Sequence, residues 1–258
     1  MGGGAGSGCG ARAGVAGPPG ADPRDAREGQ GVARYRHEAL GVVLQVRAGR
    51  LQVLLSSRRR SPYEGLWALP GGPLAPAETL AQSVARYLAE KVDVREITHL
   101  EQLETRSDPG RDPSQRVVAT AYLGLVPWDV DPQVPADAGW YDARALPATA
   151  YDHGSIVGAA VERLQAKLSY TNIGFALAAP AFTVSQLRAA YRAALGHEVS
   201  ATNLQRVLLR RGLLEPTGEL APSGRAGGRP ATVYRFRSRR LEVTDPFAVL
   251  RPPGHTSA

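Results

Sequence analysis

Aliphatic residues become dense from Glu38 onward, and their spacing first follows the pattern of strands. Leu40 to Val46 and Leu51 to Leu55 are two aliphatic runs separated by the turn-forming pair Ala48-Gly49. Short apolar runs joined by such a pair are typical of a β-hairpin whose strands are largely buried. The segment Pro62 to Pro70 is rich in turn formers, so the pattern predicts a hairpin followed by a loop.

A helical period comes next. Leu80, Val84 and Leu88 recur at steps of four, which places them on one face of a helix of about 16 residues. Further strands are predicted at Val117 to Val126 and at Trp140-Tyr141, where apolar and aromatic residues gather again. Strand, loop, helix and strand in this order predict an α/β/α sandwich with a mixed sheet.

The last third of the chain predicts a second, helical domain. Residues 154–170 keep helical spacing, and residues 183–186 form a T-x-x-Q capping box at the start of another helix. Gly196 ends that helix, and a further helix is expected from Ser200 to Arg211. The segment Arg229 to Arg237 alternates as a strand. Two helices followed by a basic hairpin predict a winged helix-turn-helix domain.

The amino-terminal segment shows neither period. Residues 1 to 32 contain 11 Gly and 3 Pro and almost no aliphatic side chains. Such a segment cannot bury enough apolar surface to offset the entropy of ordering it. We therefore predict a disordered tail over 1–33, a first domain over 34–153, a linking helix over 154–170, a winged helix over 171–240 and a tail over 241–258.

Charged residues are distributed unevenly along the chain. Residues 1–154 carry 17 basic and 18 acidic side chains, whereas residues 155–258 carry 14 basic and 6 acidic ones, a net charge of +8. This excess predicts that the carboxy-terminal part meets a polyanion. A single cysteine, Cys9, excludes an intramolecular disulfide and a cysteine-based zinc site.

The expected location is the cytoplasm of a bacterium. No stretch approaches the roughly 20 apolar residues of a membrane span, and the amino terminus has no apolar core of the kind found in signal peptides. The chain contains 29 Arg and 2 Lys, a bias that fits a high-GC bacterial genome. We therefore expect no membrane partner.

Residues 71–94 read GGPLAPAETLAQSVARYLAEKVDV and resemble the Nudix box, G-x5-E-x7-R-E-U-x-E-E-x-G-U, where U is aliphatic. The residues on signature positions are Gly72, Glu78, Arg86, Leu88, Glu90 and Val94. Tyr87 and Lys91 stand where the first and last glutamates of R-E-U-x-E-E are expected, and Asp93 replaces a glycine. An intact box points several carboxylates at one volume, where they hold divalent cations on substrate phosphates. We expect this box to bind a nucleotide without hydrolysing it and to hold no metal, although Glu90 leaves open a single weak metal or a ribose hydroxyl.

The residues around the box offer contacts for phosphate. Gly71 and Gly72 allow close approach of the backbone to an anion. The ammonium of Lys91 is itself able to meet a diphosphate. Arg58, at the end of a predicted strand, is either a diphosphate ligand or one of a solvated triplet of arginines.

Residues 107–122, SDPGRDPSQRVVATAY, closely resemble the G-D-P-x-R-D-P-R-x-R-V loop of the Nudix-related transcriptional regulators of NAD metabolism. That family joins a Nudix-like domain to a winged helix and senses ADP-ribose. The resemblance places Arg111 and Arg116 near the phosphates or ribose of the ligand, although Ser107 departs from the family's glycine. The candidate ligand-binding residues are thus Arg58, Gly71, Gly72, Glu90, Lys91, Arg111 and Arg116.

The carboxy-terminal segments TVSQLRAAYRAALG, NLQRVLLRRGLLEPTG and GRPATVYRF match the family's pattern in the same order. On a helical wheel, Leu204, Val207 and Leu208 share one face. The opposite face carries the candidate base-reading residues Thr202, Asn203, Arg206 and Arg210, since Arg suits guanine and Asn suits adenine. The candidate phosphate or minor-groove contacts in the wing are Arg225, Arg229 and Arg235. The alternative is a solvated basic helix and hairpin without DNA contact.

The resemblance implies a transcriptional repressor of NAD biosynthesis or salvage genes, with ADP-ribose or a related nucleotide as effector and no required cofactor. A homodimer would place two recognition helices on a palindromic DNA operator. Two alternatives stay open: a regulator of sugar catabolism that senses a sugar phosphate, and an active ADP-ribose or NADH pyrophosphatase. The pyrophosphatase would use other carboxylates, such as Glu78, Glu101 or Glu104. His153 is expected at a helix start or between domains rather than as a catalyst.

Overall fold

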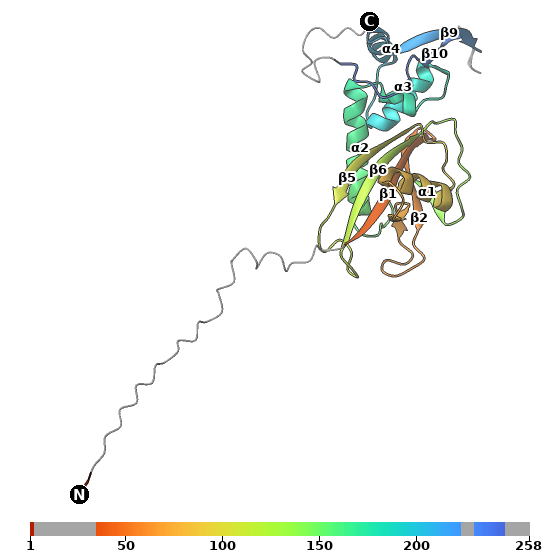
Figure 1. The fold of residues 1–258 in the computed structure, drawn as a ribbon. Coiled ribbons are helices and arrows are strands. Elements are labelled where there is room, and N and C mark those ends of the chain that lie inside the picture. The colour runs from red at the N-terminus through yellow and green to blue at the C-terminus, as the bar shows by residue number, and fades with distance from the viewer. Residues whose placement is uncertain (3–34, 223–229, 246–258) are drawn as a thin grey trace. The chain divides into compact units, whose positions relative to one another are not determined.

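The computed structural model describes residues 1–2, 35–222 and 230–245 (Figure 1). The chain divides into residues 1–34 and a compact unit from residue 35 onward, and the elements below belong to the second. Apart from residues 1–2, the tail predicted over 1–33 lies outside the described residues, as does the predicted tail beyond residue 245. The elements are β1 (Arg36–Arg47), β2 (Arg50–Ser57), β3 (Trp67–Ala68), β4 (Gly71–Pro73), α1 (Leu80–Val92), β5 (His99–Arg106), β6 (Val117–Val126), β7 (Ala138–Asp142), α2 (His153–Tyr170), the 3-10 helix η2 (Ile173–Ala176), β8 (Phe182–Thr183), α3 (Val184–Leu195), α4 (Ala201–Arg210), β9 (Leu214–Ala221) and β10 (Ala231–Phe236).

The first domain is built on a seven-stranded mixed sheet. Its main path runs β3-β2-β1-β6-β5, with β4 paired to β1 and β7 paired to β2. The predicted hairpin is β1 and β2, whose turn holds Ala48 and Gly49 at φ angles of 47° and 73°. Strand β1 runs parallel to β6, while the other pairs are antiparallel. The predicted mixed sheet is therefore confirmed.

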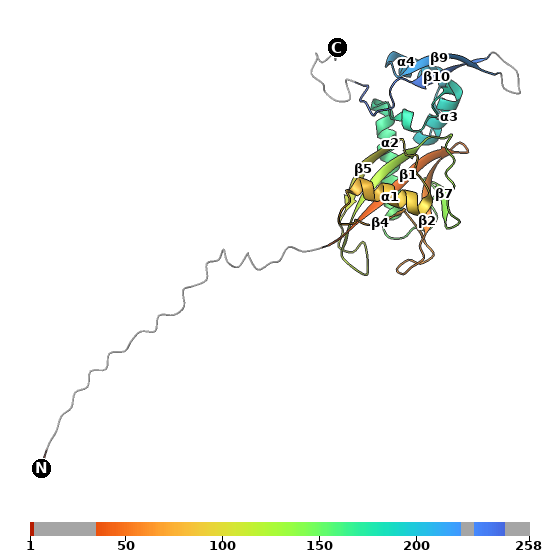
Figure 2. The same ribbon diagram turned by 45° about the vertical axis from the view of Figure 1, so that its right-hand side comes forward.

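Helices cover both faces of this sheet, as Figures 1 and 2 show. Ala39 and Val43 of β1 pack in one apolar cluster with Val84 and Leu88 of α1. The alternate residues of β1 belong to the second cluster, which contains α2 and continues into the winged helix. Because successive side chains of a strand point to opposite faces, one aliphatic run supplies both cores.

Helix α1 is shorter than predicted. It has 13 residues rather than about 16, because a capping box of Thr79 and Gln82 fixes its start. Its end is set by Asp93, which adopts the left-handed conformation with φ 51° and donates its amide to the carbonyl of Leu88. Asp93 thus performs the backbone role of the signature glycine that it replaces.

The carboxy-terminal domain consists of α3, α4 and the small sheet β8-β10-β9. The predicted capping box of Thr183 and Gln186 is present, and Gly196 ends α3 with φ 81°. Ser200 caps α4 by accepting a hydrogen bond from the amide of Asn203. Strand β10 is shorter than the predicted strand over Arg229 to Arg237. Two helices and a hairpin in this order confirm the predicted winged helix.

Residues after the wing return to the linking helix. Asn172, just beyond α2, donates its side-chain amide to the carbonyl of Arg240 and accepts from the amide of Glu242. Thr171 forms an isolated antiparallel bridge with Val243. Residues 241–245, predicted as part of a tail, are therefore fixed against the end of α2. Within the described part of the chain, no helix has both the length and the apolar character needed to cross a membrane.

Candidate functional site

A cavity of about 870 Å³ opens beside the carboxy-terminal end of α1. Its walls come from the end of β2 with residues 58–62, from the glycine turn 71–73, and from Glu90 and Lys91 of α1. Three residues of β1, residues 68–69, the loop after β5 and the segments just before β7 and at the start of α2 complete the lining. The predicted residues Arg58, Gly71, Gly72, Glu90 and Lys91 are thus brought together around one space.

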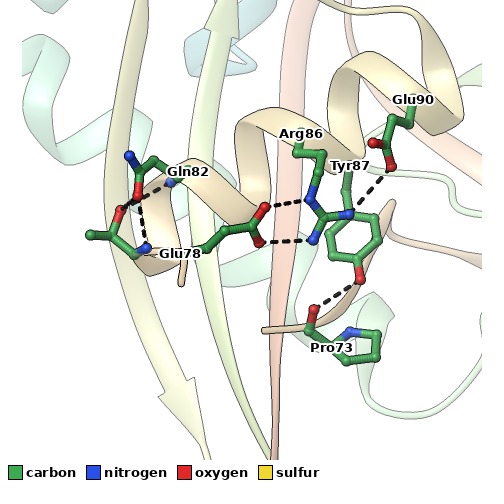
Figure 3. A network of polar contacts seen from close by, with 7 residues as sticks. Pro73, Glu78, Gln82, Arg86, Tyr87 and Glu90 are labelled. Atoms are coloured by element: carbon green, nitrogen blue, oxygen red, sulfur yellow. Dashed lines mark hydrogen bonds and ion pairs between the residues drawn. The ribbon is translucent and has the colours of Figure 1, made fainter. Parts of the chain in front are cut away.

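The charged side chains on α1 and just before it form hydrogen bonds with one another (Figure 3). Arg86 donates two hydrogen bonds to Glu78, at 2.6 and 2.9 Å, and a weaker one to Glu90 at 3.3 Å. The bond from Arg86 lowers the pKa of Glu78, and the bond to Glu78 raises the pKa of Arg86. Both signature carboxylates of this face therefore already have an internal cation.

Tyr87 fills the volume where the signature places its first glutamate. Its hydroxyl donates to the carbonyl of Pro73 at 2.9 Å (Figure 3). The ring lies so close to Gly72 that a Cβ there would be 2.6 Å from Cζ of Tyr87. The guanidinium of Arg86 lies 4.2 Å from the ring centroid. Gly72 therefore has a packing role in this chain, because any side chain would displace the tyrosine.

Lys91 places a cation at the wall of the cavity. Its ammonium donates to the carbonyl of Gly71 at 2.6 Å and lies 5.1 Å from the ring centroid of Tyr87. Burial lowers the pKa of Lys91, and the nearby positive charges of Arg58 and Arg60 act in the same direction, while Glu38 opposes them. A phosphate group placed in the cavity would relieve this unfavourable crowding of positive charge.

Arg58 also lines the cavity, and its guanidinium is held in place by two contacts. Its Nε donates to the carbonyl of Pro62 at 2.9 Å, and its guanidinium lies 4.7 Å from the ring centroid of Tyr151. Tyr151 also meets the ring of Tyr63 edge-on at 4.8 Å. Tyr151 was not among the predicted site residues, although its segment with Asp152 and His153 follows the F-D-H turn of the regulators.

Arg111 and Arg116 are absent from the described lining of this cavity. Arg111 forms a buried ion pair with Asp152, at 2.8 Å, and its side chain is only 3% exposed. Arg116 donates to the carbonyl of Ser107 at 2.6 Å. Their loop instead presents Asp112 to the cavity, together with Ser114 and Gln115. Ligand contact by the two arginines stays a prediction, and it would require the Arg111–Asp152 pair to rearrange.

His153 is the first residue of α2, as expected. Its Nδ1 accepts a hydrogen bond from the amide of Leu69 at 3.0 Å. Burial lowers its pKa to about 3, so the ring is neutral at physiological pH. An imidazole fixed as an acceptor of this amide ties Leu69, which precedes the glycine turn, to the start of α2 and is not available as a base.

The carboxylates that a hydrolase could use instead, Glu101 and Glu104, also have bonding partners within the chain. Burial opposes ionisation of Glu101, but hydrogen bonds from His99 and Lys167 lower its pKa to about 2. Glu104 accepts two hydrogen bonds from Arg106. Among the described residues, no cluster of at least three His, Cys, Asp or Glu side chains is arranged to hold a metal ion. The residues present therefore do not fit the metal cage that an intact Nudix box provides.

Helix α4 presents the polar face predicted for it. Leu204 and Leu208 are buried, whereas the predicted DNA-binding residues Thr202, Asn203, Arg206 and Arg210 are exposed. Arg206 donates to the side-chain oxygen of Asn203 at 2.7 Å, which aligns the two groups on the surface.

The predicted wing contacts are only partly described. In the wing, Arg235 is exposed and pairs with Glu215 at 2.6 Å, so DNA would have to compete with this carboxylate. Arg225 and Arg229 lie outside the described residues.

Two known domains and several relatives resemble this chain. Residues 35–158 match the NUDIX domain, and residues 174–236 match the NrtR DNA-binding winged helix domain. The chain is 30% identical over 220 residues to the ADPR responsive transcriptional repressor NtrR of Acinetobacter baylyi, which covers 83% of the chain and 86% of the relative. An ADP-ribose pyrophosphatase of Methanocaldococcus jannaschii is 30% identical over 109 residues, covering 41% of the chain and 63% of that enzyme.

A solved structure is similar to most of this chain. The crystal structure of Shewanella oneidensis NrtR complexed with a 27mer DNA is 31% identical, with a TM-score of 0.66, and the match covers 78% of this chain and 93% of that one. The match to the pyrophosphatase spans 109 residues, whereas the match to the repressor spans 220 residues and most of both chains. The chain therefore belongs to the NrtR family of regulators, in which a Nudix domain is followed by a DNA-binding winged helix.

Proposed function

We propose that this chain is an ADP-ribose-responsive transcriptional repressor of NAD biosynthesis or salvage genes. The observation that carries the proposal is the pairing of two sites in one chain. One is a cavity walled by Arg58 and Lys91 next to a Nudix box without its cage of carboxylates. The other is an exposed helix whose polar face is made of Asn, Thr and Arg. The relatives that match both domains are named as a repressor responsive to ADPR and as a protein crystallised with DNA.

Ligand binding is proposed to depend on cations of the chain itself. The diphosphate lies between Lys91 and Arg58, close to the backbone of Gly71 and Gly72, and Glu90 accepts from a ribose hydroxyl. A guanidinium and an ammonium supply the positive charge that a divalent cation supplies in hydrolases. Arg111 and Arg116 join the ligand only if their loop moves. ADP-ribose binding is accordingly expected to be independent of Mg²⁺.

Hydrolysis is not part of the proposed function. A Nudix-type hydrolysis needs carboxylates that gather metal ions on the diphosphate. In this chain Tyr87 and Lys91 occupy two of those positions, and Glu78 is held by Arg86. A sensor that leaves its ligand intact reports the ligand's concentration by occupancy alone.

DNA binding is assigned to α4 and the wing. Thr202, Asn203, Arg206 and Arg210 would face base edges, while Arg235 with the undescribed Arg225 and Arg229 would meet phosphates or the minor groove. A homodimer that binds a palindromic operator completes the proposal, because half-site spacing then matches the protein's symmetry. ADP-ribose shifts the dimer toward a geometry with lower operator affinity, which requires different ligand affinity in the two states.

The test uses the full-length protein and a duplex recovered from a random-sequence pool by the wild type. Fluorescence anisotropy should show tight binding that weakens when ADP-ribose is added without Mg²⁺, whereas ribose 5-phosphate has no effect. Chromatography of ADP-ribose incubated with protein and Mg²⁺ should show no AMP. Multiple-turnover release of AMP would favour the pyrophosphatase, and a response to the sugar phosphate alone would favour a regulator of sugar catabolism.

A further inference from the structure

Two paired strands connect the large cavity with the winged helix. Strands β2 and β7 are antiparallel, with Gln52 opposite Asp142 at one end and Ser56 opposite Ala138 at the other. The Ser56 end lines the cavity, as does Asp137, which pairs with Arg59 at 2.8 Å. Both ends of this ribbon therefore lie at functional parts of the molecule, as Figure 2 lets the reader follow from β7 and β2 to α3.

The far end of the ribbon faces the end of α3 across a small cleft. The cleft has a volume of about 410 Å³ and is lined on one side by Arg50, Asp142 and Arg144, and on the other by residues 192–193 and 196–198. Its charged groups are already paired, because Arg50 meets Asp142 at 3.3 Å and Arg192 meets Glu198 at 3.3 Å. This arrangement is a junction between two domains rather than a site for another ligand.

Arg144 spans this junction. Its Nη1 donates to the carbonyl of Ala193 at 2.9 Å, and its Nη2 donates to the carbonyl of Ala194 at 2.7 Å. The last carbonyls of a helix have no partner within the helix and carry partial negative charge. One guanidinium therefore satisfies two of them at once, and its planar fork fixes the orientation of α3 relative to β7. Gln165 also donates to the carbonyls of Ala194 and Leu195, at 3.3 and 3.0 Å, but it belongs to α2 and does not connect α3 to β7.

The neighbours of Arg144 keep it in this position. Its backbone amide donates to Oδ1 of Asp142 at 2.9 Å, so the residue is tied to the last residue of β7. Gly196, at the end of α3, has φ 81° and no side chain; a Cβ there would lie 2.9 Å from Nη2 of Arg144. The positive φ at the helix end favours glycine, and a side chain at this position would push the guanidinium of Arg144 away from its present place.

We propose that Arg144 is a positioning residue that couples occupancy of the nucleotide cavity to the orientation of the DNA-binding helices. The proposal rests on the proposed function, since it concerns the response to ADP-ribose. A diphosphate that engages Arg58 and Arg59 changes the contacts at the cavity end of β2 and β7. The far end of that ribbon carries Arg144, so the two hydrogen bonds to α3 differ between the two states. A ligand alters DNA affinity only through such a difference between states.

The experiment measures two affinities in full-length protein. Isothermal titration calorimetry gives the affinity for ADP-ribose, and anisotropy with the selected duplex gives DNA affinity with and without saturating ADP-ribose. In the wild type the ratio of the two DNA affinities is expected between about 5 and 150, the usual range of coupling between two sites. In Arg144→Ala the ratio should fall below about 3, whatever the absolute DNA affinity, with unchanged affinity for ADP-ribose.

Two further variants make the result decisive. Arg192→Ala removes an arginine from the same cleft but leaves the bonds to Ala193 and Ala194, so it should respond as the wild type does. Arg144→Lys keeps the charge without the fork and should show a reduced ratio even if the alanine variant does not fold. A wild-type ratio in a folded Arg144 variant overturns the coupling alone. A wild type that ignores ADP-ribose overturns the proposed function and the coupling together.

Discussion

Helices α1 and α4 are both amphipathic, and each is anchored by leucines on one face, yet their polar faces differ. The charges of α1 are satisfied internally: Arg86 holds Glu78 and Glu90, and Lys91 holds the carbonyl of Gly71. The polar groups of α4 stand exposed on the surface, where Arg206 contacts Asn203 of the same helix.

The difference reflects the size of the proposed ligands. A small nucleotide gains affinity when the groups around it are fixed before it arrives, because little side-chain entropy is then lost on binding. A DNA surface must instead adapt to a long polyanion and gains from counterion release by exposed cations. The polar side chains of α1 are thus fixed by contacts within the first domain, whereas those of α4 are exposed to solvent.

The largest expected effect is the loss of either helix's anchor. Leu88 of α1 is fully buried and Leu208 of α4 is nearly so. Replacing either by Ala should lower the free energy of unfolding by about 2–5 kcal/mol, through lost burial and the cavity left behind. Leu209→Ala, on the exposed side of α4, should change it by less than about 0.5 kcal/mol. Urea titration measures all three, and equal losses at Leu208 and Leu209 would refute the assignment of faces.

Removing Lys91, the cation of α1 that lines the cavity, should have the next largest effect. Lys91→Met is expected to raise the dissociation constant for ADP-ribose about tenfold to a hundredfold, as expected for a lost hydrogen bond to a charged group. DNA affinity without ligand should not change. Calorimetry provides the measurement, and Arg95→Ala, which removes an exposed cation beyond the end of α1, serves as the control. A change below about threefold would mean that Lys91 only supports the glycine turn.

Removing a cation of α4 tests the other side of the comparison. Arg206→Ala should weaken binding of the selected duplex by about 1–3 kcal/mol and relax the preference at one base position. ADP-ribose binding should stay as in the wild type, since Arg206 lies in the other domain. Anisotropy with single-base variants of the duplex measures both effects. Unchanged affinity would show that the polar face of α4 is a solvated surface.

The last prediction compares a buried histidine of the first domain with an exposed histidine of the winged helix. Burial lowers the pKa of His153 to about 3 from its ordinary value of 6.5, so between these values the unfolded chain binds more protons than the folded one. Stability should therefore fall as the pH decreases from 6.5, by up to about 1.4 kcal/mol per unit.

The comparison is best made between pH 7 and 5. Glu101, whose pKa is lowered to about 2 from 4.5, contributes its own loss only below this range. The free energy of unfolding of His153→Gln, measured with urea, should change less with pH than that of the wild type. His197→Gln, at an exposed position, should show the same pH dependence of the free energy of unfolding as the wild type. Parallel pH curves for wild type and His153→Gln would contradict the buried neutral ring.

Elements with a strong local signal could be predicted from the sequence. The hairpin around Ala48-Gly49 and the helix between Thr183 and Gly196 depend on turn and capping chemistry that neighbouring residues specify alone. Strand β5 (His99–Arg106) was missed, because its mostly polar sequence forms a strand only through pairing with β6. The helix predicted at about 16 residues has only 13, because the capping box of Thr79 and Gln82 fixes where α1 begins.

The candidate site likewise contains residues that the sequence placed and residues whose partners only the fold shows. The spacing of the box placed Glu90 and Lys91 on the same side of the helix as Tyr87, because residues three and four positions apart on a helix share a face. The loop resemblance did not reveal that the guanidinium of Arg111 pairs with Asp152, 41 residues further along the chain. Tyr151 likewise reaches Arg58 only through the fold.

The sequence by itself predicted a Nudix-like box, with Tyr87 and Lys91 at two glutamate positions of its signature, joined to a winged helix, because periodicity, capping and signature spacing are local. Only the tertiary structure decided which charges remain available. Arg86 is neutralised by Glu78, Lys91 borders the cavity and Arg144 reaches the end of α3. A side chain's partner depends on segments brought together from far apart in the chain, and no local pattern encodes that distance.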